Sequence, residues 1–333
     1  MKNGIRVIDV EHHFATVELF DAYYGLFGRT FENDGLPEKT HKEHVEECDI
    51  DELMIKRMDE AGIDFSQLSF TTPGSEYFED IEVGKRLATD SNNKAAATIK
   101  KHPDRLGAYM SLVPDDVEWS LKEIDRCISM GLWGWCTMSN YGGRSRLDDP
   151  KYLPLLKRCN ELKMPIFLHP MFPVNKEINE VGYALEGPVY GFTADTQLTF
   201  LRMMLRGVFD KLPDLKIILG HNAEGFAIYI DRIDTGYRQG MGQPYPEFGK
   251  IDHEPSYYLR HNLVGDTSGS FSNEVLNFTK QIFSTDFLVF GSDYPYENTK
   301  ASVDLVLNDK NLTFEEKKAI LQDNAEALGF GVR

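Results

Sequence analysis

Short apolar runs alternate with longer amphipathic ones along this chain. Eight nearly continuous apolar runs predict strands at residues 6–10, 66–70, 106–113, 134–138, 165–169, 216–221, 262–266 and 287–292. Strands that are covered on both faces have this composition, as in a parallel sheet. The pattern therefore predicts buried parallel strands that are separated by helices.

Helical patterns fill the intervals between these strands. Apolar residues recur at helical spacing in the segments 49–61, 83–101, 117–130, 153–162, 193–209, 225–237, 273–282, 300–307 and 314–328. Strands that alternate in this way with helices predict an α/β fold, a (β/α)8 TIM barrel, in a single domain over residues 1–333. A doubly wound sheet is the main alternative, but no GxGxxG motif follows the first strand.

The connection after the first strand, residues 11–48, is too long for an ordinary βα loop. It is rich in aromatic residues and includes His41 and His44. We expect a loop insertion over the barrel mouth, where the active sites of this fold lie. Of its histidines, His44 is the one that could fold into the pocket, and residues 139–146 are expected to help shape that pocket.

Charge and cysteine content narrow the choice of partners. The net charge of -17 repels nucleic acid and anionic membrane surfaces, although a metal ion could still attract an anionic small molecule. No apolar run is long enough to span a membrane, and the N-terminus lacks the apolar stretch of a signal peptide. The 4 cysteines include no CxxC pair, so we expect reduced thiols and a cytoplasmic protein.

Histidine and acidic residues directly follow four of the predicted strands. Glu11 and His13 follow the first strand and His169 ends the fifth, while His221 ends the sixth and Asp293 follows the eighth. The C-terminal ends of all strands surround one opening in a closed barrel. We therefore expect these five side chains to converge, although they are far apart in the sequence.

Imidazoles together with carboxylates suit Zn²⁺, Mn²⁺ or Fe²⁺ better than Ca²⁺ or Mg²⁺. Alternation along a strand puts Glu11 and His13 on one face and turns His12 to the other. A single histidine at a strand end is more often structural than a ligand. The prediction therefore depends on histidine and acidic residues occurring at the ends of several separate strands. The remaining histidines lack this context and are expected on the surface or in loops: His41, His102, His253 and His261.

Four motifs resemble those of one enzyme family. They are EHHFA at residues 11–15, LGHNAEG at 219–225 followed by DRID at 231–234, SDYPYEN at 292–298, and GFTADT at 191–196, where Asp195 replaces the family's glutamate. Together they resemble the amidohydrolase superfamily in its aminocarboxymuconate semialdehyde decarboxylase branch. Within that branch, aromatic-acid decarboxylases such as γ-resorcylate and 2,3-dihydroxybenzoate decarboxylase are the most similar.

The resemblance implies a metal centre with one divalent ion, Zn²⁺ or Mn²⁺. Its ligands would be Glu11, His13, His169 and Asp293. Residues 135–140, at the end of the fourth predicted strand, lack the lysine that bridges two metals in binuclear relatives. One ion per site is therefore expected.

The resemblance also implies the residues around the substrate. His221 would lie beside it, with Glu224 orienting the imidazole and raising its basicity. Arg232 would bind a carboxylate or serve the site of a neighbouring subunit in a homodimer or homotetramer. Phe14, Tyr23 and Phe192 could form walls against an aromatic ring, although packing is the commoner role of such residues.

The implied reaction is non-oxidative decarboxylation of a hydroxylated aromatic or related unsaturated carboxylic acid. Asp293 would protonate the ring carbon that carries the carboxylate, and His221 would exchange a hydrogen bond or proton with a ring hydroxyl. The rival is a metal-dependent hydrolase of the same superfamily, in which Asp293 directs water at a lactone or amide carbonyl. Glu11, in the place of a more usual histidine, favours decarboxylation. A barrel that binds a ligand without turnover would have disrupted site residues, and this chain retains all of them.

Overall fold

The computed structural model describes residues 4–241 and 251–332. Its strands are β1 (Ile8–Phe14), β2 (Phe65–Phe70), β3 (Leu106–Ala108), β4 (Trp135–Met138), β5 (Ile166–His169), β6 (Ile217–Leu219), β7 (Leu263–Asp266) and β8 (Leu288–Val289). Each strand pairs in parallel with the next, in the orders β1-β2-β3 and β4-β5-β6-β7-β8.

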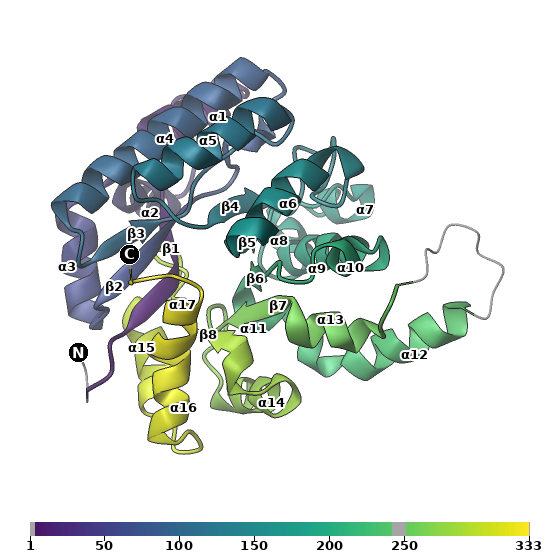
Figure 1. Cartoon of the computed structure of the whole chain (residues 1–333). Helices are drawn as coiled ribbons and strands as arrows, with labels where there is room; N and C mark the ends of the chain where they lie inside the picture. The colour runs from purple at the N-terminus through teal and green to yellow at the C-terminus, as the bar shows by residue number, and fades with distance from the viewer. Residues whose placement is uncertain (1–3, 242–250, 333) are drawn as a thin grey trace.

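Backbone hydrogen bonds join the two sets of strands into a closed barrel (Figure 1). Met110 N donates to Gly134 O at 2.8 Å, which links β3 to β4. Val10 N donates to Phe290 O at 2.9 Å, which links β1 to β8. The predicted TIM barrel is confirmed, and the closure brings the C-terminal ends of all the strands to one mouth.

Helices cover the outside of the barrel. They are α3 (Glu52–Ala61), α4 (Ile81–Lys101), α5 (Val117–Ser129), α6 (Leu153–Leu162), α9 (Gly191–Leu205), α10 (Val208–Lys211), α12 (Ile230–Met241), α13 (Pro255–His261), α14 (Asn273–Phe283), α15 (Thr299–Leu307), α16 (Phe314–Lys318) and α17 (Asn324–Ala327). Strand residues such as Leu68, Leu168 and Ile218 are fully buried beneath them. None of the described helices is long and apolar enough to cross a bilayer.

The segment after β1 holds two helices, α1 (Val17–Gly25) and α2 (Glu38–Cys48), where we expected only a loop. Phe20, Tyr24 and Phe31 form a small core of their own in it. His44 stacks on Phe20 at 4.4 Å, and burial lowers the pKa of His44 to about 4. This histidine packs within the insertion, because the ring of Phe20 and the hydroxyl of Tyr24 offer it partners there.

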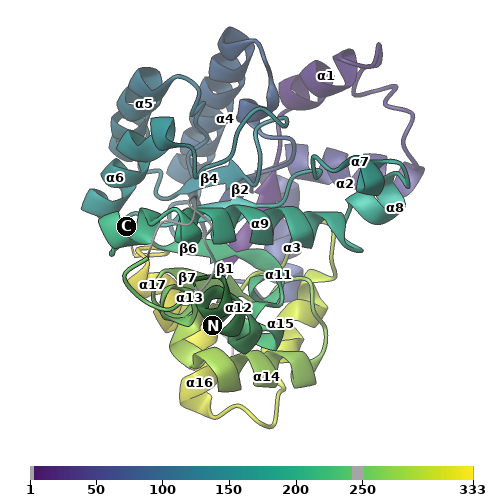
Figure 2. The ribbon, with the colours of Figure 1, turned by 90° about the vertical axis from the view of Figure 1, so that its right-hand side faces the viewer.

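Two more short helices, α7 (Lys176–Asn179) and α8 (Tyr183–Glu186), lie in the connection between β5 and α9. The helices α1 and α2 follow the C-terminal end of β1, and α7 and α8 follow that of β5. Figure 2 shows all four helices on one side of the barrel. The long connections of this chain therefore surround the barrel mouth.

Several elements differ from the sequence prediction. Strands β6 and β8 are shorter than the predicted runs at 216–221 and 287–292, and the predicted helix at 193–209 is divided into α9 and α10. Strand β3 ends at Ala108, and only a single bridge at Met110 continues its pairing. The predicted helix at 314–328 contains a π-helical turn, Ala319–Asp323. The helix predicted to begin at residue 225 begins at Ile230, because a left-handed turn, α11 (Gly220–Glu224), and a short 3-10 helix, Phe226–Ile228, precede it.

Candidate active site

Three side chains meet at the mouth of the barrel as a potential metal site. Glu11 and His13 come from β1, and His169 comes from β5. One ligand atom from each lies within 4.8 Å of the other two, and all three residues are buried. Barrel closure has thus brought together residues that are separated by most of the first half of the chain.

Neighbouring groups orient both imidazoles toward this point. Ser69 Oγ lies 3.0 Å from Nδ1 of His13, and Thr72 Oγ1 lies 3.1 Å from Nδ1 of His169. Pro170 O lies 2.9 Å from the same nitrogen of His169. Because Nδ1 is engaged in each ring, Nε2 is the nitrogen left to bind an ion, which is the usual arrangement around metal-binding histidines.

The buried carboxylate of this site lacks hydrogen-bond donors, and the imidazole beside it faces acidic groups. Neither oxygen of Glu11 has a hydrogen-bond partner among the described residues, and Nε2 of His13 faces the carboxylates of Glu11 and Asp293. Burying such groups without a partner is costly, and an unpaired carboxylate is the most costly of them. A divalent ion would satisfy all of these atoms at once. The residues present therefore fit the divalent metal that the sequence led us to expect.

Asp293 lies between this cluster and His221. Its Oδ1 is 3.2 Å from His13 Nε2, and its Oδ2 is 3.9 Å from His221 Nε2. The backbone N–H of Asp293 donates to Glu11 O at 3.1 Å, which fixes the start of the β8 loop against β1. Asp293 can thus contact both an ion held by β1 and a substrate beside β6.

The charges of the site favour a cation. Burial tends to lower the pKa of His13, but hydrogen bonds and charge from Asp293 and Glu11 raise it to about 10. Burial and the neighbouring His13 lower the pKa of His169, which leaves its imidazole neutral. Burial opposes ionisation of Asp293, yet His13 and His221 outweigh it and hold the pKa of that carboxyl below its ordinary value. Without a bound ion, the protonated imidazole of His13 supplies the positive charge of the site. A bound ion would supply that charge in its place.

His221 and Glu224 form a close pair on the left-handed turn α11. Nδ1 of His221 lies 2.9 Å from Oε1 of Glu224, and Glu224 is buried. Four consecutive non-glycine residues, from His221 to Glu224, have φ between 51° and 55°. The pair therefore lies on a turn whose backbone is strained for side-chain-bearing residues.

The aromatic residues proposed as ring walls occupy different environments. Phe14 is buried in the core, with 1% of its surface exposed. Tyr23 is half-buried, and its ring lies 5.7 Å from that of Tyr77. Phe192 is half-buried, with its ring 5.4 Å from that of Phe172. Tyr23 and Phe192 thus keep a free surface that Phe14 lacks.

Arg232 is exposed in the first turn of α12, a helix that extends away from the barrel in Figure 1. Its side chain has no hydrogen bond or ion pair to the residues at the mouth within the described parts of the chain. The structure of one chain therefore does not bring Arg232 together with the other candidate residues.

Sequence reasoning missed a carboxyl group that lies behind the metal site. Glu47 on α2 is fully buried, and its Oε2 accepts a hydrogen bond from Tyr296 OH at 3.0 Å. The ring of Tyr296 lies 5.8 Å from that of His13. Burial raises the pKa of Glu47 to about 7. No periodic pattern could single out Glu47, because its helix is largely polar and was expected to be a loop.

The GFTADT motif has a structural role in this fold. Asp195 on α9 is buried and accepts two hydrogen bonds from Arg146, at 2.5 and 2.9 Å. Ser139 Oγ and Asn140 Nδ2 also donate to Asp195 Oδ2, at 2.5 and 2.7 Å. Asp195 therefore anchors both ends of the 139–146 segment, which was expected to shape the pocket.

Comparison with known proteins places these observations in a family. The amidohydrolase family model matches residues 8–328. The γ-resorcylate decarboxylase of Polaromonas sp. is 30% identical over 332 residues, covering 96% of this chain and 97% of the relative.

Two solved structures are also similar over nearly the whole chain. The 5-carboxyvanillate decarboxylase of Novosphingobium aromaticivorans, solved with manganese and a nitrobenzoic acid, has a TM-score of 0.92 at 28% identity and covers 98% of this chain and 97% of that one. A dihydroxybenzoic acid decarboxylase of Polaromonas sp., solved with manganese and the inhibitor 2-nitroresorcinol, has a TM-score of 0.85 at 27% identity. The shared coverage is 97% of this chain and 96% of that one.

Proposed function

This chain belongs to the amidohydrolase family, and on that premise we propose that it is a metal-dependent, non-oxidative decarboxylase of a hydroxylated aromatic carboxylic acid. The observation that carries the proposal is the group of Glu11, His13 and His169, whose ligand atoms converge while both oxygens of the buried Glu11 carboxylate have no hydrogen-bond donor among the described residues. Full-length similarity to several aromatic-acid decarboxylases supports this reaction over hydrolysis.

Glu11, His13, His169 and Asp293 would hold the ion, for which we propose Mn²⁺ because two of the similar structures contain it. When bound, the ion would chelate the substrate carboxylate and an adjacent phenolic oxygen, and polarise the ring. Glu11 supplies negative charge and His169 a neutral nitrogen, a ligand set that suits Mn²⁺ or Zn²⁺.

Asp293 would deliver the proton to the ring carbon that carries the carboxylate. The carboxyl group is ionised in the protein alone, since His13 and His221 lower its pKa. An anionic substrate beside it would raise its affinity for a proton, because like charges disfavour ionisation, and Asp293 would then take up from solvent the proton that it delivers. The C–C bond to the carboxylate then breaks, CO₂ leaves, and the electron pair restores the aromatic ring.

His221 would orient the ring through one of its hydroxyl groups. Its Nε2 faces the Asp293 carboxylate at 3.9 Å, while Nδ1 is held by Glu224 at 2.9 Å. The paired carboxylate fixes the ring and makes Nε2 a stronger base. A substrate hydroxyl adjacent to the reacting carbon could therefore exchange a hydrogen bond or proton with His221.

We also propose that Arg232 serves the site of a second copy in a homodimer or homotetramer. Its exposure on α12 leaves it free to contact a partner. Exposed apolar side chains lie along the connection between β5 and α9 and just before α12: Val181, Tyr183, Val189, Tyr190 and Ile228. Such side chains are typical of subunit interfaces.

A mixing experiment tests this assignment of Arg232. Asp293→Asn and Arg232→Ala chains, each inactive alone, are unfolded, mixed and refolded together. If Arg232 acts across the interface, a mixed dimer contains one complete site, and activity returns. If Arg232 acts within its own chain, no site is complete and the mixture stays inactive.

Unpaired cysteines support a reducing compartment for the enzyme. All four are free thiols, and Cys127, Cys136 and Cys159 are buried. Proteins of oxidising compartments commonly use cysteines for disulfides. We therefore propose a cytoplasmic location, which fractionation of the source cells would test.

The reaction is tested by a panel of substrates. Metal-loaded protein is incubated with dihydroxybenzoates, and with lactones and amides in parallel, while CO₂ release and loss of the acid's absorbance are followed. The proposal expects CO₂ from at least one phenolic acid. Turnover of lactones or amides alone would exclude the decarboxylase and favour the hydrolase.

A further inference from the structure

The loop after β7 contacts His221 from two directions. Ser268 Oγ accepts a hydrogen bond from the backbone N–H of His221 at 2.9 Å. Gly269 lies against the imidazole itself, since a Cβ at this position would be 2.5 Å from Cδ2 of His221. The loop therefore contacts both the backbone and the ring of the residue that we place beside the substrate.

Ser268 is itself held by a buried carboxyl group. Its hydroxyl donates to Asp266 Oδ1 at 2.6 Å, and its backbone N–H donates to the same oxygen at 2.9 Å. Asp266 ends β7 and is fully buried, and only 1% of the surface of Ser268 is exposed. With its proton committed to Asp266, the Ser268 oxygen is oriented as an acceptor for the His221 N–H.

Gly269 completes the contact because only glycine fits there. Its φ is +66°, a conformation that side chains disfavour, and a Cβ would also come within 3.0 Å of Cβ and Cγ of His221. The backbone N–H of Gly269 donates to Glu297 Oε2 at 3.2 Å, which ties the loop to the segment after β8. The imidazole can therefore approach the loop backbone closely.

We infer that Ser268 and Gly269 are positioning residues for His221, and that they hold the left-handed turn of α11 in the shape that aims the imidazole at the substrate. The φ values of 51° to 55° at His221–Glu224 disfavour this turn, so outside contacts must stabilise it. The Asp266–Ser268 pair supplies one such contact at the first residue of the turn. This inference rests on the proposed function only for the identity of the reaction.

The test is a double-mutant cycle between Ser268→Ala and His221→Asn. We expect Ser268→Ala to lower kcat by about tenfold or more, since a small misplacement of a catalytic group has effects of this size. In the His221→Asn background the same change should lower kcat less than about twofold, because the residue through which Ser268 acts is gone. Ser268→Thr, which keeps the hydroxyl, should recover most of the activity.

A matched control separates positioning from a general loss of packing. Ser120→Ala removes another fully buried hydroxyl, which donates to Val113 O at 2.7 Å on the outer helix layer. It should leave kcat within about twofold of the native value. If Ser268→Ala does not fold, Gly269→Ala carries the test, because its Cβ must displace the imidazole and should produce a larger, equally non-additive loss.

A readout without turnover distinguishes this inference from the proposed function. The ring ¹⁵N resonances of His221 are assigned in histidine-labelled, diamagnetic protein by their loss in His221→Asn. They should shift in Ser268→Ala and not in Ser120→Ala, whatever reaction the protein catalyses. Unshifted resonances, or fully additive effects on kcat, would overturn the positioning role. Shifted resonances in a protein that decarboxylates no phenolic acid would overturn the proposed function alone.

Discussion

The two ends of the barrel both present charged residues, but only the C-terminal mouth leaves a buried charged group among them without hydrogen-bond partners in the described parts of the chain. At that mouth, both carboxylate oxygens of Glu11 are buried without a partner, beside Nε2 of His13, which faces the Glu11 and Asp293 carboxylates. At the N-terminal end, a cleft of about 500 Å³ is lined by Arg6, Asp59, Asp64, Asp104 and Arg105.

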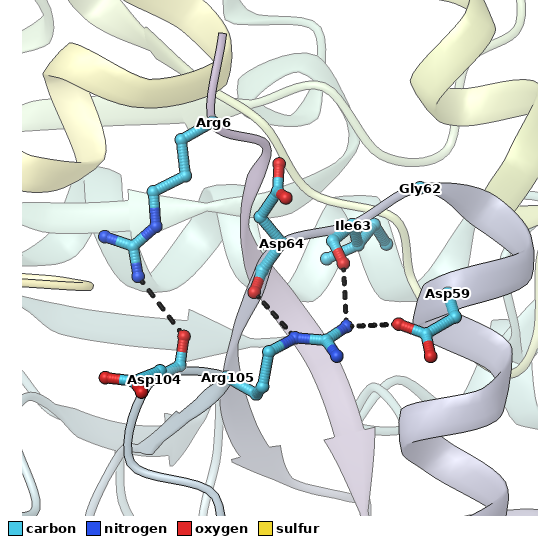
Figure 3. A pocket seen from close by; sticks show the side chains of 7 residues that line it. All are labelled: Arg6, Asp59, Gly62, Ile63, Asp64, Asp104 and Arg105. Atoms are coloured by element: carbon cyan, nitrogen blue, oxygen red, sulfur yellow. Dashed lines mark hydrogen bonds and ion pairs between the residues drawn. The ribbon is translucent and has the colours of Figure 1, made fainter. Parts of the chain in front are cut away.

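The arginines of the N-terminal cleft bond to neighbouring backbone carbonyls and to an aspartate (Figure 3). Arg105 donates to Asp64 O at 3.0 Å, to Ile63 O at 3.1 Å and to Asp59 Oδ1 at 2.7 Å. Arg6 donates to Gly331 O at 2.6 Å and so binds the C-terminal segment. Within residues 4–241 and 251–332, no polar side chain of this cleft has a buried atom without a partner.

The two ends differ in whether their buried charged groups already have partners within the protein, and this separates a site that can bind an ion from a cleft whose charges are structural. The N-terminal cleft uses its arginines to hold the ends of β1, β2 and β3 together. The mouth leaves the buried Glu11 carboxylate without donors among the described residues, which is unfavourable for the protein alone and becomes favourable when an ion binds.

The largest effect is expected from a substitution of Asp293 at the mouth. Asp293→Asn should lower kcat by at least about 1,000-fold, because it removes the proposed proton donor while keeping the shape of the side chain. Bound metal should decrease less, since Glu11, His13 and His169 remain. Steady-state kinetics and metal analysis on the same samples measure both, and an unchanged kcat would refute the role of Asp293.

The pair beside β6 should have a smaller effect. His221→Asn should lower kcat by about 100-fold, and Glu224→Gln by about tenfold, because the carboxylate only orients and strengthens the base. Kinetics over a range of substrate concentrations measure both variants. A loss in Glu224→Gln that exceeds the loss in His221→Asn would contradict this order.

A third change, at Glu76, tests whether a buried carboxyl group near the mouth lowers the free energy of unfolding as the pH rises. Glu76 is fully buried behind β4, where Thr137 Oγ1 and Met138 N donate to it at 2.9 and 2.8 Å. Burial raises the pKa of Glu76 from 4.5 to about 7, despite these hydrogen bonds. The folded state therefore holds this proton more tightly, and the stabilisation is lost as pH rises from about 4.5 through about 7.

Glu76→Gln should remove that loss. As the pH rises from about 4.5 to 7.5, the native protein should lose about 3 kcal/mol more of its free energy of unfolding than the variant loses. Urea titrations at several pH values measure this, with the exposed Glu82→Gln as the matched control. Parallel pH profiles of native and Glu76→Gln protein would show that Glu76 is not protonated by burial.

The smallest effect on activity is expected at the N-terminal cleft. Arg105→Met should leave kcat within about twofold and lower the free energy of unfolding by about 1–2 kcal/mol, because the backbone carbonyls of Ile63 and Asp64 lose a donor. Kinetics and urea titration of the variant measure the two quantities. A tenfold loss of kcat with normal stability would mean that this end of the barrel takes part in the reaction.

The barrel and its central cluster could be predicted from the sequence, because both depend on strand ends. Parallel buried strands appear as apolar runs, and Glu11, His13, His169, His221 and Asp293 adjoin such runs directly. Once the barrel closes, their convergence follows from topology alone. The same rule indicates Asp266, which ends the seventh predicted strand, although it was not recognised as part of the site.

Other parts of the site could not be predicted, because their partners come from segments without a periodic signal. Glu47 depends on how α2 packs behind β1, and its pairing with Tyr296 crosses nearly the whole chain. The left-handed turn at His221–Glu224 contains no glycine that would indicate it. Such a conformation depends on tertiary contacts from the β7 loop, which local sequence does not encode.

The central claim is that the ends of β1, β5 and β8 bind one divalent ion. The most direct measurement is elemental analysis of protein purified without chelators, beside Glu11→Gln and His13→Asn variants. We expect about one equivalent of manganese or zinc per native chain and a loss of most of it in both variants. Native protein that holds no such ion, and neither binds added Mn²⁺ nor gains activity from it, would show that these strand ends are not a metal site.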